Sequence, residues 1–348
     1  MRIERFDPVT DTEKIRVCHD LFVAAQAVDD PLVPPASLPV FTGWVSRGWD
    51  ANPREGWLVP GDQAGTWAAY LLLEFPVREN RHWAHIDLLV APGQRRRGIG
   101  AALLRHAVIR ATDQGRAKLV CDTREGTAGG AFAAAVGADR GVIEVRRILD
   151  LASLPAGRLD ALREQAEAAS AGYSIVTWSG RIPEEYMAKV ALVVNAMADA
   201  PHNPGEEPEV HDADRIREGE ALDLIQKNRG YSVAAICDQT GEMAGLTRVV
   251  VDPPRPHWGF QQLTAVVRAH RGHRLGLRVK VAMMDWLARA EPQLEHIITG
   301  NSSSNSHMIG INEDMGYRVL DRWQSWELDV PKALSTLASP AQAGAEVR

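Results

Sequence analysis

Two long stretches of the chain repeat one order of apolar and polar positions. In 85–115 an apolar run leads into a loop rich in arginine and glycine, and then into a segment with the 3.6-residue period of an amphipathic helix; 263–292 has the same order. An apolar run that ends at a proline precedes each of them, at 67–76 and 244–254. The pattern predicts two strands, a loop and a helix in each half of the chain.

The elements around these stretches also occur twice. The two halves share a helix that ends in an acidic turn, a strand after the loop helix, a short helix that ends at a glycine, and a final strand. These elements are predicted at 15–31 and 188–201, at 118–123 and 296–301, before Gly137 and Gly316, and around 142–149 and 323–328. A repeated order at offsets of about 170 residues implies two copies of one fold.

The repeat sets the expected domain organisation. A chain of 348 residues has room for about two domains. We expect an N-terminal lobe at 1–153, a helical linker at 154–172 that begins at Pro155, a C-terminal lobe at 173–330, and a small, polar and frayed tail at 331–348.

Composition narrows the class of protein. The chain is 45% hydrophobic and 24% charged with a formal net charge of −6, as in soluble globular proteins, and this charge argues against general nucleic-acid binding. Its three cysteines form no CxxC pair, so disulfides and thiolate metal sites are not expected. No leader segment or long apolar run indicates secretion or membrane insertion, so the expected compartment is the cytoplasm.

The loop RRRGIG at 95–100 has the chemistry of an anion site. It joins a strand to the start of a helix, where free backbone N–H groups and the helix dipole favour negative charge. Gly98 and Gly100 remove side chains that would keep a diphosphate away, and the three arginines add positive charge. A solvated arginine loop is the alternative for such a short motif. The GxGxxG of a Rossmann fold is absent.

The second loop, HRGHRLG at 270–276, is the counterpart of the first. Arg271, Arg274 and Gly276 take the places of Arg95, Gly98 and Gly100. A nucleic-acid patch and a metal site are the other interpretations of its histidines and arginines. Arg274 leaves two alternatives open, because its side chain either contacts phosphate or fills the cradle.

The segment around the first loop resembles the acetyl-CoA-binding segment of the GNAT N-acetyltransferase superfamily. Its order is strand, V-x-P, [QR]-x-x-G-x-[GA] and helix, filled here by Val90, Pro92, Arg95, Gly98 and Gly100. The resemblance extends over 3–150 and 173–329. It implies an α/β (α+β) fold class with two lobes, each a mixed, mostly antiparallel twisted sheet that is flanked by helices and ends in a closing hairpin.

The resemblance also implies a cofactor site for acetyl-CoA, or another short acyl-CoA, as co-substrate, without a metal. The strand before the loop splays from its neighbour in this family, and pantetheine amides pair with its exposed edge at Leu88, Leu89 and Val90. The pyrophosphate would lie on the segment from Arg95 to Ala102, which comprises Arg95, Arg96, Arg97, Gly98, Ile99, Gly100, Ala101 and Ala102.

The implied reaction is direct acyl transfer to an amine. Asp87 lies where many relatives carry an acidic residue, and His85 projects on the same strand face, so either is a candidate base. Each also has an ordinary interpretation as a structural or surface residue. The tyrosine acid of the family is missing, because Ala133 lies four residues before Gly137.

A second cofactor site in the C-terminal lobe is less complete. It would consist of Val266, Arg271, Arg274, Gly276 and Asn305, where an asparagine commonly contacts the pantetheine arm. Leu263 and Gln261 replace the two candidate bases, and Asn312 stands at the acid position. This half resembles that of actinobacterial tandem acetyltransferases, including mycothiol-synthase-like proteins and those of antibiotic gene clusters.

The predicted function is N-acetylation of a primary amine on a small metabolite, such as an antibiotic or its precursor, by a monomer or homodimer. No nucleic-acid or membrane partner is expected. Two alternatives remain: a non-catalytic acyl-CoA-binding regulatory module, and catalysis in the C-terminal lobe alone. Candidates for the acceptor pocket are Asp29, Asp30, His257 and the tryptophans Trp44, Trp49, Trp57 and Trp67, although each also fits an ordinary structural role.

Overall fold

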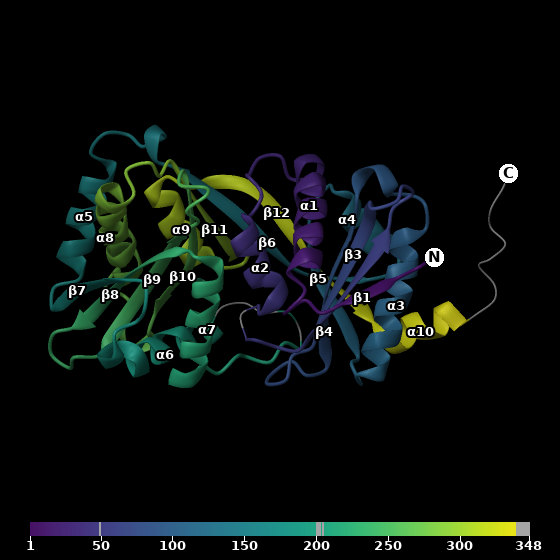
Figure 1. The fold of residues 1–348 in the computed structure, drawn as a ribbon. Helices are drawn as coiled ribbons and strands as arrows, with labels where there is room; N and C mark the ends of the chain where they lie inside the picture. Colours follow the sequence, from purple (N-terminus) through teal and green to yellow (C-terminus); the bar gives the residue numbers. More distant parts are fainter. Residues whose placement is uncertain (49, 200–202, 204, 339–348) are drawn as a thin grey trace. The chain divides into compact units, whose positions relative to one another are not determined.

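The computed structural model describes residues 1–48, 50–199, 203 and 205–338 (Figure 1). The chain divides into two compact units. Unit 1 comprises Met1–Gly141 with Trp323–Arg348, and unit 2 comprises Val142–Arg322.

Unit 1 contains a six-stranded sheet in the order β1-β2-β3-β4-β5-β12. Among the described strands of this unit, β4 and β5 pair in parallel, whereas β1–β2, β2–β3, β3–β4 and β5–β12 are antiparallel. Helices α3 and α10 pack over one face through Leu103, Ala107 and Val330, and α1 and α2 over the other through Ile15 and Phe41. The elements are β1 (Glu4–Phe6), α1 (Thr12–Asp29), α2 (Leu38–Ser46), β2 (Arg54–Pro60), β3 (Trp67–Glu74), β4 (Trp83–Val90), η1 (Pro92–Gln94), α3 (Ile99–Asp113), β5 (Lys118–Arg124), α4 (Ala128–Ala135), β12 (Arg318–Asp329) and α10 (Val330–Ala338).

Unit 2 repeats this plan with the order β6-β11-β10-β9-β8-β7. Here β10 and β11 are the parallel pair. The amphipathic helix α8 buries Val279 and Met283 on one face of the sheet, and α6 buries Val190 and Val193 on the other. The elements are β6 (Asp139–Asp150), η2 (Leu151–Ser153), α5 (Arg158–Ala169), β7 (Tyr173–Ser179), η3 (Glu184–Tyr186), α6 (Met187–Asn195), η4 (Ala196–Asp199), α7 (Ala213–Gln226), β8 (Arg229–Cys237), β9 (Met243–Val251), β10 (Trp258–Val266), η5 (Arg268–His270), α8 (Leu275–Ala290), β11 (His296–Ser302) and α9 (Ser306–Met315).

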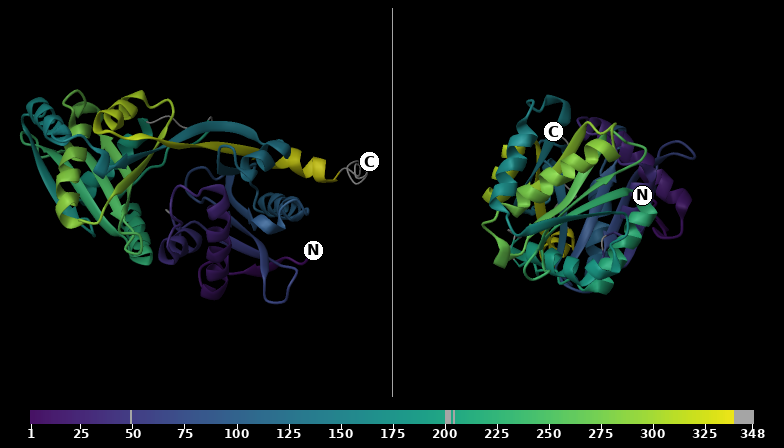
Figure 2. Two further views of the ribbon diagram at one scale, coloured as in Figure 1. Left: turned by 90° about the horizontal axis from the view of Figure 1, so that it is seen from above. Right: turned by 90° about the vertical axis from the view of Figure 1, so that its left-hand side faces the viewer.

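The units exchange their last strands, which the sequence did not predict. Within unit 1, Trp323–Asp329 of β12 pair with Lys118–Arg124 of β5. Within unit 2, Glu144–Asp150 of β6 pair with β11 (Figure 2). The compact units therefore differ from the expected contiguous lobes, and one long exchanged strand stands in place of the closing hairpin. Apolar alternation shows that a strand is half-buried but does not specify its partner, which explains the difference.

The segment between the predicted lobes is a packed part of unit 2. It forms the predicted helix, α5, but Leu162 and Ala166 are buried against α8. Arg163 binds both carboxylate oxygens of Asp285 on α8 at 2.6 and 2.9 Å. The segment is therefore a structural layer as well as a connection.

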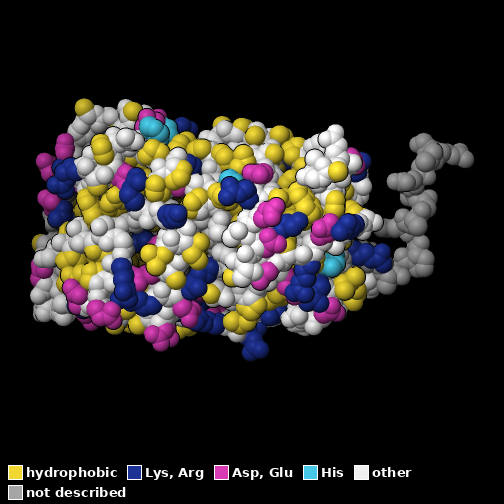
Figure 3. Space-filling model, viewed as in Figure 1, with side chains coloured by type: hydrophobic (Ala, Val, Ile, Leu, Met, Phe, Trp, Pro, Cys, Tyr) yellow, Lys and Arg dark blue, Asp and Glu magenta, His cyan; other side chains and the backbone are white. Residues whose placement is uncertain are grey.

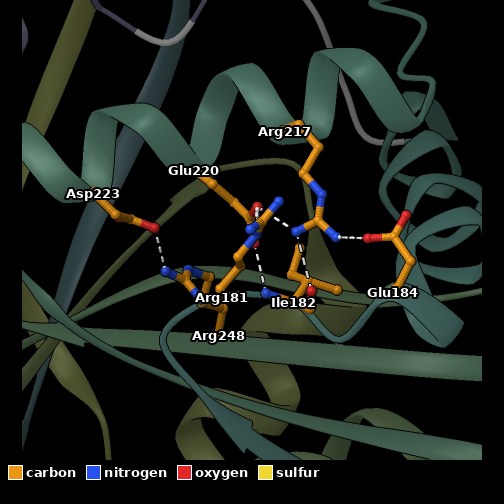
Figure 4. A network of polar contacts seen from close by, with 7 residues as sticks. All are labelled: Arg181, Ile182, Glu184, Arg217, Glu220, Asp223 and Arg248. Carbon is orange, nitrogen blue, oxygen red and sulfur yellow. Dashed lines mark hydrogen bonds and ion pairs between the residues drawn. The ribbon is translucent and has the colours of Figure 1, made fainter.

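Ion pairs hold α7 to its surroundings in unit 2. Arg217 lies between Glu184 and Glu220, and Arg248 of β9 binds Asp223 at 2.5 Å (Figure 4). Each guanidinium has a carboxylate partner, so we interpret this network as a structural one that fixes α7 in unit 2. Cationic and acidic side chains are also interspersed over the face of the molecule shown in Figure 3.

Candidate functional site

Strands β4 and β5 separate in the middle of unit 1. They pair in parallel over Trp83–His85 and Lys118–Val120. Beyond His85, β4 continues to Val90 along β3 alone. The edge of β4 at Leu88, Leu89 and Val90 therefore faces an opening between two strands, as the resemblance implied. A strand edge of this kind presents backbone groups to which the amides of a ligand can bind.

The loop after β4 brings the start of α3 to this opening. Its backbone turns through two left-handed residues, Arg96 with φ 63° and Gly98 with φ 80°. A side chain at Gly98 would point into open space, whereas one at Gly100 would lie 3.6 Å from Phe132. The first N–H groups of α3 have no helical partner, so the loop offers an anion the donors that the sequence predicted.

Two of the three arginine side chains of the loop contact carboxylates of the protein. Arg95 turns back and binds both carboxylate oxygens of Asp29, at 2.9 and 2.5 Å, and donates from Nε to the carbonyl of Val90 at 3.1 Å. Arg97 pairs with Asp62 at 2.6 Å. Both therefore fix the loop, while Arg96 is exposed. A carboxylate that forms two hydrogen bonds with a guanidinium competes effectively with a phosphate for it. The spacing of residues in the sequence does not reveal a partner as distant as Asp29.

Asp29 and Asp30, the candidates for contact with the acceptor amine, each lie beside an arginine. Arg124, at the end of β5, donates to the carbonyl of Asp29 at 2.7 Å and lies 3.8 Å from the buried carboxylate of Asp30. Two acidic residues at a helix C-terminus are unfavourable with the dipole, so the arginines compensate both. The end of α1 thus holds the loop after β4 and the end of β5 together across the opening.

Asp87 lies on β4 directly beside this opening. Leu89 packs against α1 and α2 whereas Leu88 packs against α3, so strand alternation places Asp87 on the α1 and α2 side of the sheet. The buried hydroxyl of Tyr70 donates to Asp87 Oδ2 at 3.2 Å. Although the Asp87 side chain reaches solvent in the opening, the protein around it limits hydration of its charge and raises the pKa of the carboxyl group to about 6, while Tyr70 and Arg54 oppose the rise. Asp87 is therefore ionised at neutral pH and basic enough to accept a proton.

His85 and Cys121 are further polar residues on the two strands that separate. His85 is exposed two residues from Asp87 on the same side, with its ring 6.4 Å from that of Trp83. Cys121 on β5 is half-buried, and burial together with nearby acidic residues raises the pKa of its thiol to about 12, so it remains protonated. Ala133, at the expected acid position, is buried and brings no proton donor.

Unit 2 contains the same opening. Pairing of β10 with β11 ends at Gln261 and Thr299, and β10 carries a bulge between Gln261 and Leu263. Beyond the bulge, β10 continues to Val266 along β9 alone. Leu263 packs in the apolar cluster of α6, so this opening lacks a counterpart of Asp87.

The loop of unit 2 reproduces the backbone of the first one. Arg274 takes the left-handed conformation of Gly98, with φ 51°, at a cost of roughly 1–2 kcal/mol. Its guanidinium donates to Gln165 at 2.9 Å on the protein surface. Arg271 repeats the clamp of Arg95, because it donates to the Val266 carbonyl at 3.3 Å and to Asp199 at 2.6 Å. Of the two alternatives for Arg274, its side chain does not fill the cradle.

Asn305, for which a pantetheine contact was expected, has a structural role at the start of α9. It is the N-cap of α9, where its side chain accepts from the N–H of Met308 at 3.3 Å. Gly276 lies close to the same helix, since a methyl group on this glycine would come within 3.1 Å of Ile311. Asparagine is a preferred N-cap residue, so the short helix predicted directly after Asn305 could have indicated this role from the sequence.

The remaining acceptor candidates are spread over both units. His257 precedes β10 at the end of that strand away from the loop, and pairs with Glu295 at 3.2 Å. Trp57 is buried in the core, Trp67 lies under Lys14, and Trp44 is 42% exposed on α2. Trp49 lies outside the described residues.

A buried polar network in unit 2 was not predicted from the sequence. Lys280 of α8 donates to Asn312 at 2.7 Å and lies 4.9 Å from the ring centroid of Tyr317, whose hydroxyl donates to Gln261 at 3.4 Å. Asn312 donates onward to Asn301 at 2.7 Å. Burial alone lowers the pKa of Lys280 to about 7. The sequence could have indicated this network, because Lys280 stands at a position of α8 where the helical pattern places apolar residues.

Comparisons with known proteins agree with this geometry. A model described as the acetyltransferase (GNAT) family matches residues 22–133. A solved tandem GNAT protein from the clavulanic acid biosynthesis pathway, without AcCoA, is 28% identical; the match covers 94% of this chain and 99% of that one, with a TM-score of 0.78.

Other comparisons are more distant. A GCN5-related N-acetyltransferase from Sphaerobacter thermophilus shares the fold at 15% identity, with 94% and 96% of the two chains covered and a TM-score of 0.66. No curated protein matches the sequence. None of the helices in the described part of the chain has both the length and the apolar character that crossing a bilayer requires.

Proposed function

Because this chain belongs to the GNAT superfamily and has the tandem form of its fold, we propose that it transfers an acyl group from acyl-CoA to a primary amine, and that the reaction takes place in unit 1. The observation that carries the proposal is Asp87, a carboxylate with a pKa of about 6 beside the opening between β4 and β5. A base of this pKa is ionised at neutral pH yet still accepts a proton from a reacting amine.

The residues of unit 1 support a direct transfer. The loop from Arg95 to Ala102 would bind the pyrophosphate through its backbone, and the edge of β4 would align the pantetheine arm. The amine would approach from the α1 and α2 side, where Asp87 faces. As nitrogen attacks the thioester carbonyl, the N–C bond forms, the C–S bond breaks, and the amine proton passes to Asp87 directly or through water.

Protonation of the departing thiolate falls to solvent in this proposal. Ala133 replaces the acid, and Phe132 beside Gly100 carries no hydroxyl. The thiolate of a leaving coenzyme is a weak enough base to depart without a strong acid, because free thiols have a pKa of about 8.5.

We propose a small amine of a biosynthetic pathway as acceptor, with acetyl-CoA as donor and the cytoplasm as compartment. Support comes from the tandem GNAT protein of clavulanic acid biosynthesis, which matches nearly the whole chain. Within the described part of the chain, the opening of unit 2 has no carboxylate base, because Leu263 and Leu246 take the places of Asp87 and Tyr70. We therefore propose that the role of unit 2 is mainly structural.

Asp87→Asn tests the proposal. The variant should bind acetyl-CoA in a calorimetric titration with nearly wild-type affinity, because the loop and the strand edge are unchanged. Its release of CoA thiol in the presence of an accepted amine should fall by about 10²–10⁴-fold, the usual contribution of a general base. Asp139→Asn is the control and should keep wild-type turnover, because this exposed carboxylate lies at the start of β6, in the part of that strand that belongs to unit 1.

Two results would contradict the proposal. Turnover by Asp87→Asn at the wild-type rate would remove Asp87 as the base. Wild-type protein that binds acetyl-CoA but acylates no member of a broad amine library would favour the alternative, an acyl-CoA-binding regulatory module, which the lack of a tyrosine at Ala133 and Asn312 would suit.

A further inference from the structure

Tyr70 of β3 is a buried tyrosine whose hydroxyl has one partner among the described residues. It is 1% exposed and packed against Phe41, with ring centroids 6.4 Å apart. Its hydroxyl donates to Asp87 Oδ2 at 3.2 Å. Burial and the Asp87 carboxylate raise the pKa of Tyr70 well above its ordinary value, so its hydroxyl stays protonated at neutral pH.

The two units provide an internal comparison for this pair. Tyr70 lies opposite Leu89, two residues after Asp87. The same register in unit 2 places Leu246 opposite Ala265, two residues after Leu263. Two leucines of unit 2 therefore stand at the positions of Tyr70 and Asp87. These leucines, Leu246 and Leu263, belong to one apolar cluster. A buried tyrosine hydroxyl without a nearby carboxylate would lose its hydrogen-bond acceptor, which is unfavourable. This explains why unit 1 has both the tyrosine and the aspartate, whereas unit 2 has neither.

The other groups that face Asp87 do not position it. Arg54 of β2 acts through charge, and its hydrogen bond goes to Glu74. Cys18 of α1 and Cys121 of β5 approach it with thiols whose pKa values are raised, so both are neutral. His85 lies on the same strand. Tyr70 alone joins Asp87 by a hydrogen bond among the described residues.

We propose that Tyr70 is the positioning residue of the base, and this rests on the proposed function of Asp87. The hydroxyl holds Oδ2, so the carboxylate keeps one orientation and leaves Oδ1 to receive the proton. The bond favours the ionised carboxylate, which keeps Asp87 ready as a base near neutral pH. Tyr70 itself contacts no reacting atom in this role.

Tyr70→Phe tests the inference, because it removes only the hydroxyl from a packed ring. Without its donor, Asp87 should titrate at a higher pH than in the wild type. kcat/KM should then fall several-fold at pH 6 and much less at pH 9, with the acid limb of the profile moved upward. Tyr231→Phe is the matched control, since that buried tyrosine of unit 2 also donates to a carboxylate, Glu291, at 2.6 Å. It should leave the limb unmoved.

A second measurement needs no turnover. Carbon-13 NMR of labelled aspartate carboxyl groups, assigned with Asp87→Asn, follows the titration of Asp87 directly. A higher midpoint in Tyr70→Phe supports the inference even if no amine is accepted. An unchanged midpoint in folded Tyr70→Phe overturns it. So does a further loss of activity when Tyr70→Phe is added to Asp87→Asn, because the hydroxyl would then act without the carboxylate.

Discussion

At the scale of single residues, Lys280 shows most clearly how unit 2 differs from unit 1. It lies four residues after Gly276, and Leu104 lies four residues after Gly100. Asn312, its hydrogen-bond partner, likewise takes the place of Ala133. Unit 2 thus buries a lysine–asparagine pair where unit 1 has leucine and alanine. Replacing buried charged or polar partners by well-packed apolar residues is often neutral or stabilising.

The double change Lys280→Leu with Asn312→Ala should therefore raise stability in a pH-dependent way. The folded-state pKa of about 7 lies below the unfolded value of Lys, so wild-type stability increases as pH rises from 7 towards 10. The double variant should exceed the wild type most at pH 7 and below, by an amount on the order of a few kcal/mol, and least at pH 10. Urea unfolding at both pH values measures this. A gain that does not shrink at high pH would show that lysine protonation is not the cause.

At the scale of elements, the sequence predicted the part of the site that local backbone chemistry determines. Strand β4, the loop and α3 follow from apolar periodicity, the glycines and the helix start, and all three form as expected. The partners of Arg95 and Asp87 could not be predicted, because Asp29 and Tyr70 lie 66 and 17 residues away in the chain. Side-chain contacts of that kind depend on tertiary packing.

The loop of unit 1 offers a matched pair of variants to test its phosphate role. Gly98 is left-handed, and both Asn and Asp tolerate that conformation, so Gly98→Asn and Gly98→Asp place similar strain on the loop. Only the aspartate brings a negative charge to the start of α3. Acetyl-CoA should bind at least tenfold more weakly to Gly98→Asp than to Gly98→Asn by calorimetry. Arg274→Asp and Arg274→Asn in unit 2 are the controls, and equal affinities for the Gly98 pair would contradict the assignment.

At the scale of the whole molecule, the exchanged strands make each unit depend on a distant part of the chain. The core of unit 1 includes Leu328 and Val330, which follow unit 2 in sequence. The side chain of Gln324 donates to the carbonyl of Gly141 at 3.0 Å. The point where the chain leaves unit 1 therefore lies next to the point where it returns. A fragment of residues 1–153, the lobe expected from sequence, lacks this strand and would expose the edge of β5.

Two fragments test this dependence. Residues 1–153 alone should unfold without a cooperative transition or aggregate, because an open apolar strand edge favours association. Residues 1–141 joined by a short glycine–serine linker to 323–338 restore β12 and α10, and should unfold cooperatively and bind acetyl-CoA. Circular dichroism with heating and calorimetry compare the two. Cooperative unfolding of 1–153 at a similar temperature would mean that β6 can complete the sheet of unit 1, and that the exchange is a choice between two equivalent closing strands.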